Sequence, residues 1–131
     1  MNIEDVEITT GGSLSAQTGI MIDACEKVRL RGVKVDGIPG KGIEVRISAG
    51  VLVDDCELRN TGLSASIGID ISEASVHCRV RDCRISEPGI GVAVGSIPAT
   101  GVDGVCRHNQ VRGCFIEGAA TYGVHIEAHS R

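Results

Sequence analysis

The chain has 131 residues, with one Tyr, one Phe and no Trp, and its formal net charge is −4. This length is typical of one domain, and so few aromatic residues argue against a globular core built on aromatic packing. The acidic balance disfavours nucleic acid as a partner, and the absence of any long apolar run disfavours a membrane.

A six-residue pattern recurs five times along the chain. It consists of an aliphatic residue, a polar residue, Asp or Gly, a small apolar residue, any residue, and a second aliphatic residue. The copies are residues 3–8, 30–35, 53–58, 80–85 and 111–116. Their first residues lie 27, 23, 27 and 31 positions apart, and a period in this range indicates a repeat architecture.

The two aliphatic residues of each copy are five positions apart, which is out of phase for one straight strand. A bend at the third position restores the phase, and the Asp and Gly found there tolerate positive φ. Each copy therefore predicts a strand, a one-residue corner and a second strand. The fourth residues should form one inward column, made of Val6, Val33, Cys56, Cys83 and Cys114.

A second pattern, Gly-aliphatic-x-aliphatic, alternates with the first. It occupies residues 19–22, 42–45, 68–71, 91–94 and 123–126. Three short strands per turn, with no helical stretch to form a crossover, predict a coil in which each turn stacks on the previous one. The two patterns resemble the parallel β-helix repeat of the right-handed β-helix, or pectin-lyase-like, superfamily. The predicted fold is all-β, a right-handed single-stranded parallel β-helix of about five turns.

Residues 1–131 are therefore predicted to form a single β-helix domain. The first pattern already begins at Ile3, the last ends at Ile126, and no capping repeat is recognisable. Solenoids need caps, and open strand edges are normally covered or paired. We therefore expect either a piece of a longer β-helix or a homo-oligomer whose chains contact one another through the coil ends.

Four of the six cysteines occupy predicted inward positions. Neighbouring residues of parallel strands are about 4.8 Å apart with nearly parallel Cβ vectors, which suits a disulfide poorly. Free core thiols are expected, and with no leader sequence they favour cytoplasmic synthesis. These four are Cys56, Cys78, Cys83 and Cys114. The remaining two, Cys25 and Cys106, fall in turns and the patterns do not place them.

Two columns of outward residues on the Gly-aliphatic strands are the candidate site. The first column is Met21, Glu44, Asp70, Ala93 and His125. The second column is Asp23, Arg46, Ser72, Gly95 and Glu127. Adjacent carboxylates raise each other's pKa and can divide acid and base roles, and an Arg can neutralise a uronate. The resemblance implies that polysaccharide would be processed on this face.

We accordingly expect catalytic roles for Glu44, Asp70 and Arg46 in a lyase, hydrolase or epimerase that acts on acidic polysaccharide. Substrate binding is expected from three further residues. These are Asp23, Ser72 and His125. The alternative is a non-catalytic coil that binds glycan or builds an assembly, as tailspike shafts and adhesins do. Whether the chain is an enzyme stays open at this point.

No cofactor is predicted, and no Cys-x-x-Cys spacing indicates zinc. His125, Glu127 and His129 could form a metal-binding tail, but one short segment is thin support for it. The partner expected from the sequence is a polysaccharide or another glycan.

Overall fold

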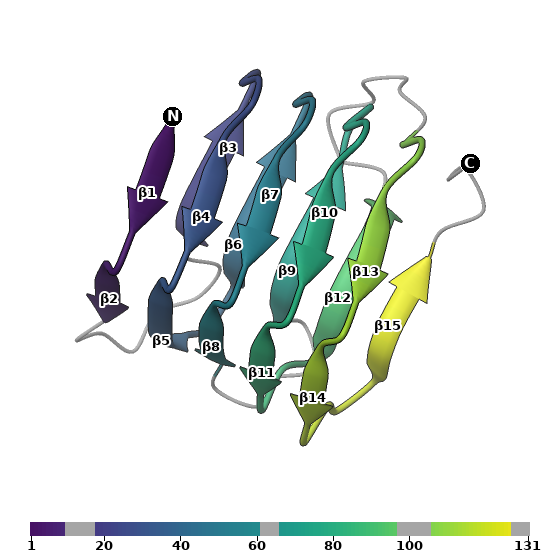
Figure 1. Cartoon of the computed structure of the whole chain (residues 1–131). Coiled ribbons are helices and arrows are strands. Elements are labelled where there is room, and N and C mark those ends of the chain that lie inside the picture. Colours follow the sequence, from purple (N-terminus) through teal and green to yellow (C-terminus); the bar gives the residue numbers. More distant parts are fainter. Residues whose placement is uncertain (10–17, 61–65, 97–105, 127–131) are drawn as a thin grey trace.

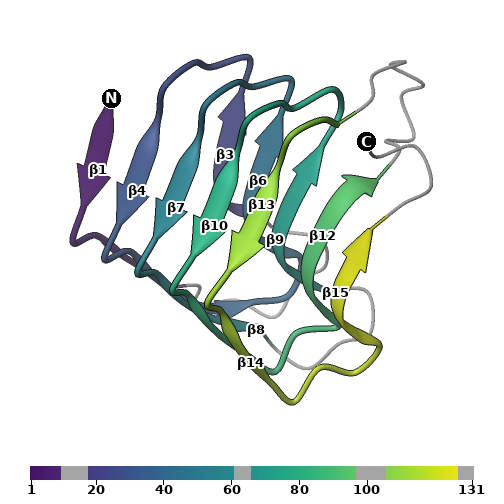
Figure 2. The same ribbon diagram turned by 45° about the vertical axis from the view of Figure 1, so that its right-hand side comes forward.

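The computed structural model describes residues 1–9, 18–60, 66–96 and 106–126. Within these ranges the chain forms fifteen strands and no helix, and hence no helix that could span a membrane. The strands build three parallel sheets of five strands each (Figures 1 and 2). Each turn contributes one strand to every sheet, which confirms the predicted five-turn coil.

Sheet A contains the first strand of each turn, sheet B the second and sheet C the third. Sheet A consists of β1 (Asn2–Glu4), β4 (Arg29–Arg31), β7 (Leu52–Asp54), β10 (Arg79–Arg81) and β13 (Gln110–Arg112). Sheet B consists of β2 (Glu7–Thr9), β5 (Lys34–Ile38), β8 (Glu57–Asn60), β11 (Arg84–Ser86) and β14 (Phe115–Glu117). Sheet C consists of β3 (Thr18–Asp23), β6 (Lys41–Arg46), β9 (Ile67–Ser72), β12 (Ile90–Ser96) and β15 (Tyr122–Ile126).

Two residues separate the strands of sheets A and B in every turn, and the first of them forms the corner. Its φ lies between 50° and 64°, in the left-handed region. Asp and Gly adopt this region more readily than most residues, because Asp bonds locally and Gly has no Cβ. The corner residues are those predicted, Asp5, Gly32, Asp55, Asp82 and Gly113.

The inward column that follows these corners is also confirmed. The amide of Glu57 donates to the carbonyl of Val33, and that of Arg84 to Cys56, both at 2.9 Å. Val33, Cys56 and Cys83 are buried in the core. The end members of the column, Val6 and Cys114, are more exposed because they have a neighbouring turn on one side only.

Five glycines form a second column at the start of the sheet C strands. A Cβ on Gly68 would lie 2.5 Å from the carbonyl oxygen of Gly91 and 2.6 Å from Cγ2 of Ile85. Gly19, Gly42 and Gly91 meet the next turn in the same way. Backbone and core side chains therefore leave no room for a side chain in this column. At Gly123, in the last turn, a Cβ would have nothing within 4 Å.

All six cysteines are free thiols. Cys78 is buried, as expected from its predicted inward position. Cys106, which the patterns did not place, is also buried. Cys25 lies at the corner between sheets C and A, where its amide donates to Oγ of Ser48 at 3.1 Å.

Candidate functional site

The predicted carboxylate pair lies side by side but is not open to solvent. Glu44 and Asp70 are register partners on β6 and β9 of sheet C. Their strand neighbours belong to the core, so by alternation the two carboxylates lie on the outer face of the sheet. Asp70 is nevertheless 0% exposed and Glu44 7%. Both residues therefore lie in the predicted outward column, but their side chains are covered.

Lys41 explains how these two carboxylates tolerate burial. Its Nζ lies 2.7 Å from Oε1 of Glu44 and 2.7 Å from Oδ2 of Asp70. Burial of the ammonium disfavours its charge, but the hydrogen bonds to Asp70 and Glu44 outweigh that effect and raise the pKa of Lys41. A buried carboxylate needs such a cation, because leaving its charge unpaired lowers the stability of the fold by an amount on the order of several kcal/mol. We call Lys41, Glu44 and Asp70 the buried ion triad.

Arg46, the third predicted catalytic residue, pairs with two carboxylates outside the buried ion triad. Its Nη2 lies 3.2 Å from Oε2 of Glu73, which is buried, and its Nε lies 3.8 Å from Oδ1 of Asp23. The carboxylate partners of Arg46 are thus Glu73, which is buried and directly follows β9, and Asp23, which is the last residue of β3. Sequence patterns missed Glu73, because it follows the strand at a turn position with positive φ.

The remaining predicted residues are not gathered into one site. Ser72 is buried, and its carbonyl accepts a hydrogen bond from Oγ of Ser75 at 2.7 Å. His125 is partly buried and lies two turns away from Asp70, with Ala93 between them in the column. Its ring contacts Tyr122, with centroids 4.8 Å apart.

The second outward column needs one correction. A bulge in β12 places Ser96, not Gly95, opposite Ser72. Gly95 has φ of 86° and provides the extra residue. Glu127 and His129 lie outside the described residues, so the metal-binding alternative in the tail is not described.

The two carboxylates of the buried ion triad are covered and already paired, so they are not placed to contact a substrate. Two carboxylates share one ammonium, and neither side chain is accessible to a polymer in this conformation. Such an arrangement holds neighbouring strands of sheet C together. Catalytic roles for Glu44, Asp70 and Arg46 remain predictions that this geometry does not favour.

Sheet A carries a feature that the sequence analysis did not single out. Its outward residues flank the inward aliphatic residue of each strand, and in the second and fourth turns both flanking residues are arginines. The face holds five arginines and two carboxylates. The arginines are Arg29, Arg31, Arg79, Arg81 and Arg112, and the acids are Glu4 and Asp54. The repeated triplet Arg-aliphatic-Arg was the sequence signal for this face.

Asp54 forms ion pairs with two of these arginines. Arg81 Nε lies 3.2 Å from its Oδ1, and Arg29 Nη2 lies 3.5 Å from its Oδ2. The hydrogen bond from Arg81 lowers the pKa of Asp54 more than partial burial raises it. Asp54 is only 8% exposed, so the two arginines largely cover its negative charge.

Asp54→Asn is expected to lower the free energy of unfolding by about 1 kcal/mol near neutral pH. Because the folded pKa lies below the ordinary 3.8, this contribution is present above that value and lost as pH falls through the folded pKa. Denaturant titrations of both proteins at neutral and strongly acidic pH measure it. An equal difference at both pH values would contradict an ionic origin.

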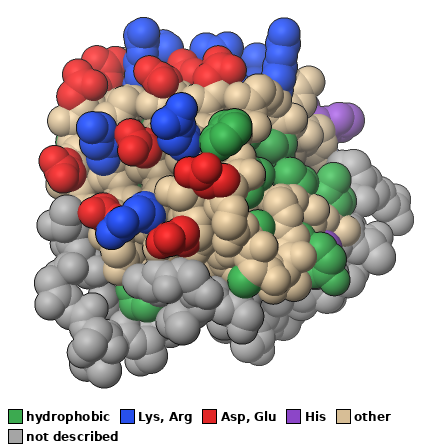
Figure 3. Space-filling model, turned by 90° about the horizontal axis from the view of Figure 1, so that it is seen from below, with side chains coloured by type: hydrophobic (Ala, Val, Ile, Leu, Met, Phe, Trp, Pro, Cys, Tyr) green, Lys and Arg blue, Asp and Glu red, His purple; other side chains and the backbone are tan. Residues whose placement is uncertain are grey.

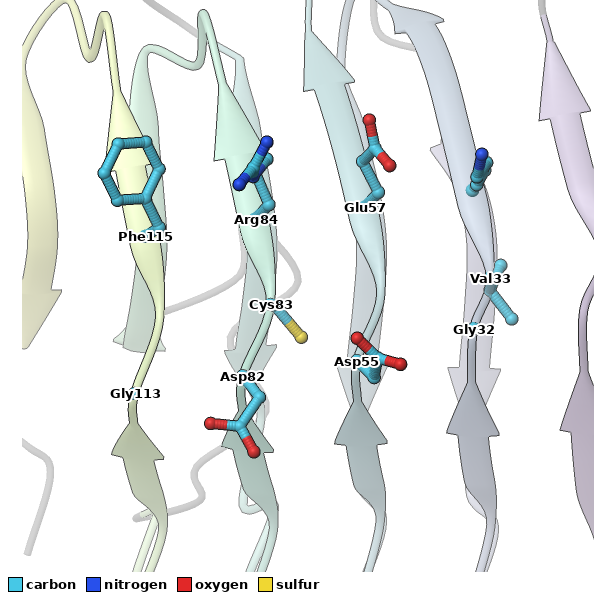
Figure 4. A pocket seen from close by; sticks show the side chains of 10 residues that line it. Gly32, Val33, Asp55, Glu57, Asp82, Cys83, Arg84, Gly113 and Phe115 are labelled. Atoms are coloured by element: carbon cyan, nitrogen blue, oxygen red, sulfur yellow. The ribbon is translucent and has the colours of Figure 1, made fainter.

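A shallow groove of about 470 Å³ runs along the corner between sheets A and B (Figure 4). Asp55, Asp82 and Glu57 contribute carboxylates, and Lys34 and Arg84 contribute cations. One end of the groove is closed by Phe115, whose ring lies 5.6 Å from the Arg84 guanidinium carbon.

Sheet B continues this mixture of charges. Its first outward column runs Glu7, Lys34, Glu57 and Arg84 through successive turns. Acidic and basic side chains are accordingly interspersed on this side of the molecule (Figure 3). Opposite charges on neighbouring strands stabilise the sheet modestly, and they leave no field of one sign. Sheet A is therefore the face with the stronger charge bias.

Among the described residues, no group of three or more His, Cys, Asp or Glu side chains could hold a metal ion. No curated protein and no solved structure matched the chain. A family model described as "Right handed beta helix region" matches residues 1–131, the whole of the sequence. Together with three parallel sheets built from stacked turns, this match shows that the chain belongs to the right-handed β-helix family.

Proposed function

We propose that the chain is a non-catalytic β-helix domain that binds an acidic polysaccharide on the outer face of sheet A. The observation that carries this proposal is the group of five arginines on one flat sheet face. They stand out in a chain whose net charge is −4. The guanidinium group matches carboxylate and sulfate geometry, because it donates two parallel hydrogen bonds.

The spacing of these arginines suits an extended polymer. Arg29 and Arg31 flank one inward residue, as do Arg79 and Arg81, so each pair is separated by about 6.6 Å along its strand. Neighbouring turns are about 4.8 Å apart. A chain with an acidic group on each sugar could therefore contact several arginines at once. Each additional contact is intramolecular, which raises the overall affinity without requiring a deep pocket.

Other faces are less suitable for a polyanion. Carboxylates of Asp55, Asp82 and Glu57 line the corner groove and would repel one. On sheet C, the two carboxylates of the buried ion triad are covered, and Lys41 is already paired with both of them. Among anionic polymers, a glycan fits better than a nucleic acid. The five strands of sheet A, all within the described residues, carry no aromatic side chain on which a base could stack.

The test removes two positive charges from sheet A in Arg31→Gln/Arg79→Gln. Within the described part of the chain neither arginine forms an ion pair, so the fold should be unaffected. The matched control, Lys34→Gln/Arg84→Gln, removes the same charge from sheet B in the same two turns. We expect polygalacturonate to bind the first variant roughly tenfold more weakly at low salt, with a much smaller effect in the control.

Calorimetry with polygalacturonate, neutral dextran and double-stranded DNA as probes distinguishes the outcomes. Binding of polygalacturonate alone, weakened by salt, supports the proposal. Equal loss in both variants, tighter binding of DNA, or no binding of polygalacturonate would overturn it. Release of unsaturated products or new reducing ends would contradict the non-catalytic part.

A further inference from the structure

Exposed large apolar side chains gather at the two ends of the coil. The N-terminal end is formed by β1, β2 and β3, and the C-terminal end by β13, β14 and β15. Of eight such side chains among the described residues, seven belong to the first or last turn. They are Met1, Val6, Met21, Phe115, Tyr122, Val124 and Ile126. Ile47 is the exception. Met21 and Phe115 point outward from the sheets. Val6, Val124 and Ile126 instead continue inward columns, so they expose core-type apolar surface at the two ends.

The two ends match each other turn for turn. If the last turn of one copy preceded the first turn of another, Cys114 would lie over Val6 and Val124 over Ile20. These are the columns that bury Val33, Cys56 and Ile43 inside the coil. The edge strands at both ends run in the same direction, so a second copy could continue all three sheets in parallel.

The glycine column supports the same arrangement. In the first four turns a Cβ would meet the carbonyl oxygen of the next glycine at 2.4 to 2.7 Å. Gly123 keeps its place in the column although nothing lies within 4 Å of a Cβ there. Gly19 of a second copy would supply the missing carbonyl. Gly123 therefore leaves the same room for a closely packed further turn that the other four glycines provide within the coil.

Charge also favours contact between unlike ends. Within sheet A, Glu4 is the register partner of Arg31, and Arg31 of Asp54. The column ends with Arg81 beside Arg112, two like charges. Placing Glu4 of a second copy next to Arg112 would give this arginine a neighbour of opposite charge.

Contact between like ends is geometrically poorer. Turning one coil over reverses the order in which sheets A, B and C follow one another around its axis. At most one sheet could then face its own counterpart, and its strands would meet antiparallel. Only contact between unlike ends continues all three sheets in parallel.

We propose that the C-terminal end of this chain binds the N-terminal end of a second copy, so that coils associate head to tail. Such a heterologous contact does not close, and it generates open linear assemblies. The partner that binds each end is the opposite end of an identical chain, which has the same three-sheet outline. The inference does not depend on glycan binding.

Two variants block one end each. Gly123→Ala places a methyl group where the Gly19 carbonyl of the next copy would lie. Val6→Lys places a charge in the apolar column at the other end, where the side chain is 41% exposed. Neither change should disturb the isolated fold. The control, Ile47→Lys, replaces an exposed apolar residue away from both ends.

Sedimentation velocity over a dilution series gives the answer. We expect the wild type and Ile47→Lys to grow beyond two chains as concentration rises, and each end variant alone to remain a single chain. Mixed together, Gly123→Ala and Val6→Lys should form a dimer and nothing larger, because one free end of each kind remains. A wild type that stays monomeric, stops at a dimer, or associates equally well with Gly123→Ala would overturn the proposal.

Discussion

Gly68→Ala is expected to lower the free energy of unfolding by about 2 to 3 kcal/mol. The added Cβ would lie 2.5 Å from a backbone oxygen of the next turn and 2.6 Å from a buried isoleucine. Neither neighbour can move freely, since Gly91 is fixed by the sheet and Ile85 is fully buried. The strand must therefore shift against the core, and the spacing between turns is disturbed.

Gly123→Ala is the matched control, because it adds the same methyl group to the same column. Nothing lies within 4 Å of that Cβ, and the residue does not have positive φ. Its stability should be unchanged or raised by up to about 1 kcal/mol, since alanine restricts the unfolded chain. Denaturant unfolding at a dilution where the chain is monomeric measures both variants. Equal destabilisation of the two would contradict the steric explanation.

Lys41→Met should cost about 3 to 5 kcal/mol of unfolding free energy, because it leaves two adjacent buried carboxylates without their cation. Methionine conserves most of the apolar length of the lysine side chain, so lost packing contributes little. The triple variant Lys41→Met/Glu44→Leu/Asp70→Leu should recover much of this loss. Removing a whole buried ionic group is usually far less damaging than removing one partner.

The control for this prediction is Arg59→Met. Arg59 pairs with Asp36 at 2.8 Å, but both side chains are about half exposed or more, so little stability should be lost. The pH dependence gives a second check. The folded pKa of Lys41 is raised, so the stabilisation is present at neutral pH and lost as strongly alkaline pH passes that pKa. If Lys41→Met were as stable as Arg59→Met, the pairing of Lys41 with the two carboxylates would contribute little to the free energy of unfolding.

The architecture was predictable because it depends on local rules repeated five times. The alternation of apolar residues fixes which side chains point inward, and positive φ at Asp55 or Gly32 fixes the corner. Register follows from both, so Glu44 and Asp70 could be paired correctly from the sequence. The bulge at Gly95 was missed because it breaks the period without changing the residue types.

The candidate site was less predictable, because strand periodicity says which face a residue occupies but not whether that face is covered. Lys41 is the first residue of β6, directly before the glycine of the second repeated pattern, and no periodic position marks it. The arginines of sheet A were visible as repeated triplets. Their significance depends on five strands lying flat beside one another, and that follows only from the assembled sheet.

Each strand of the coil pairs only with strands of the adjacent turns. Interactions that stabilise one turn are therefore shared with its immediate neighbours and with no others, as in other quasi-one-dimensional proteins. The outer turns, supported from one side, are the least costly to open, and the third turn is the most costly. We therefore expect unfolding to start in the two outer turns and to proceed inward, so that the turn carrying Asp54 and Asp70 is the last to unfold.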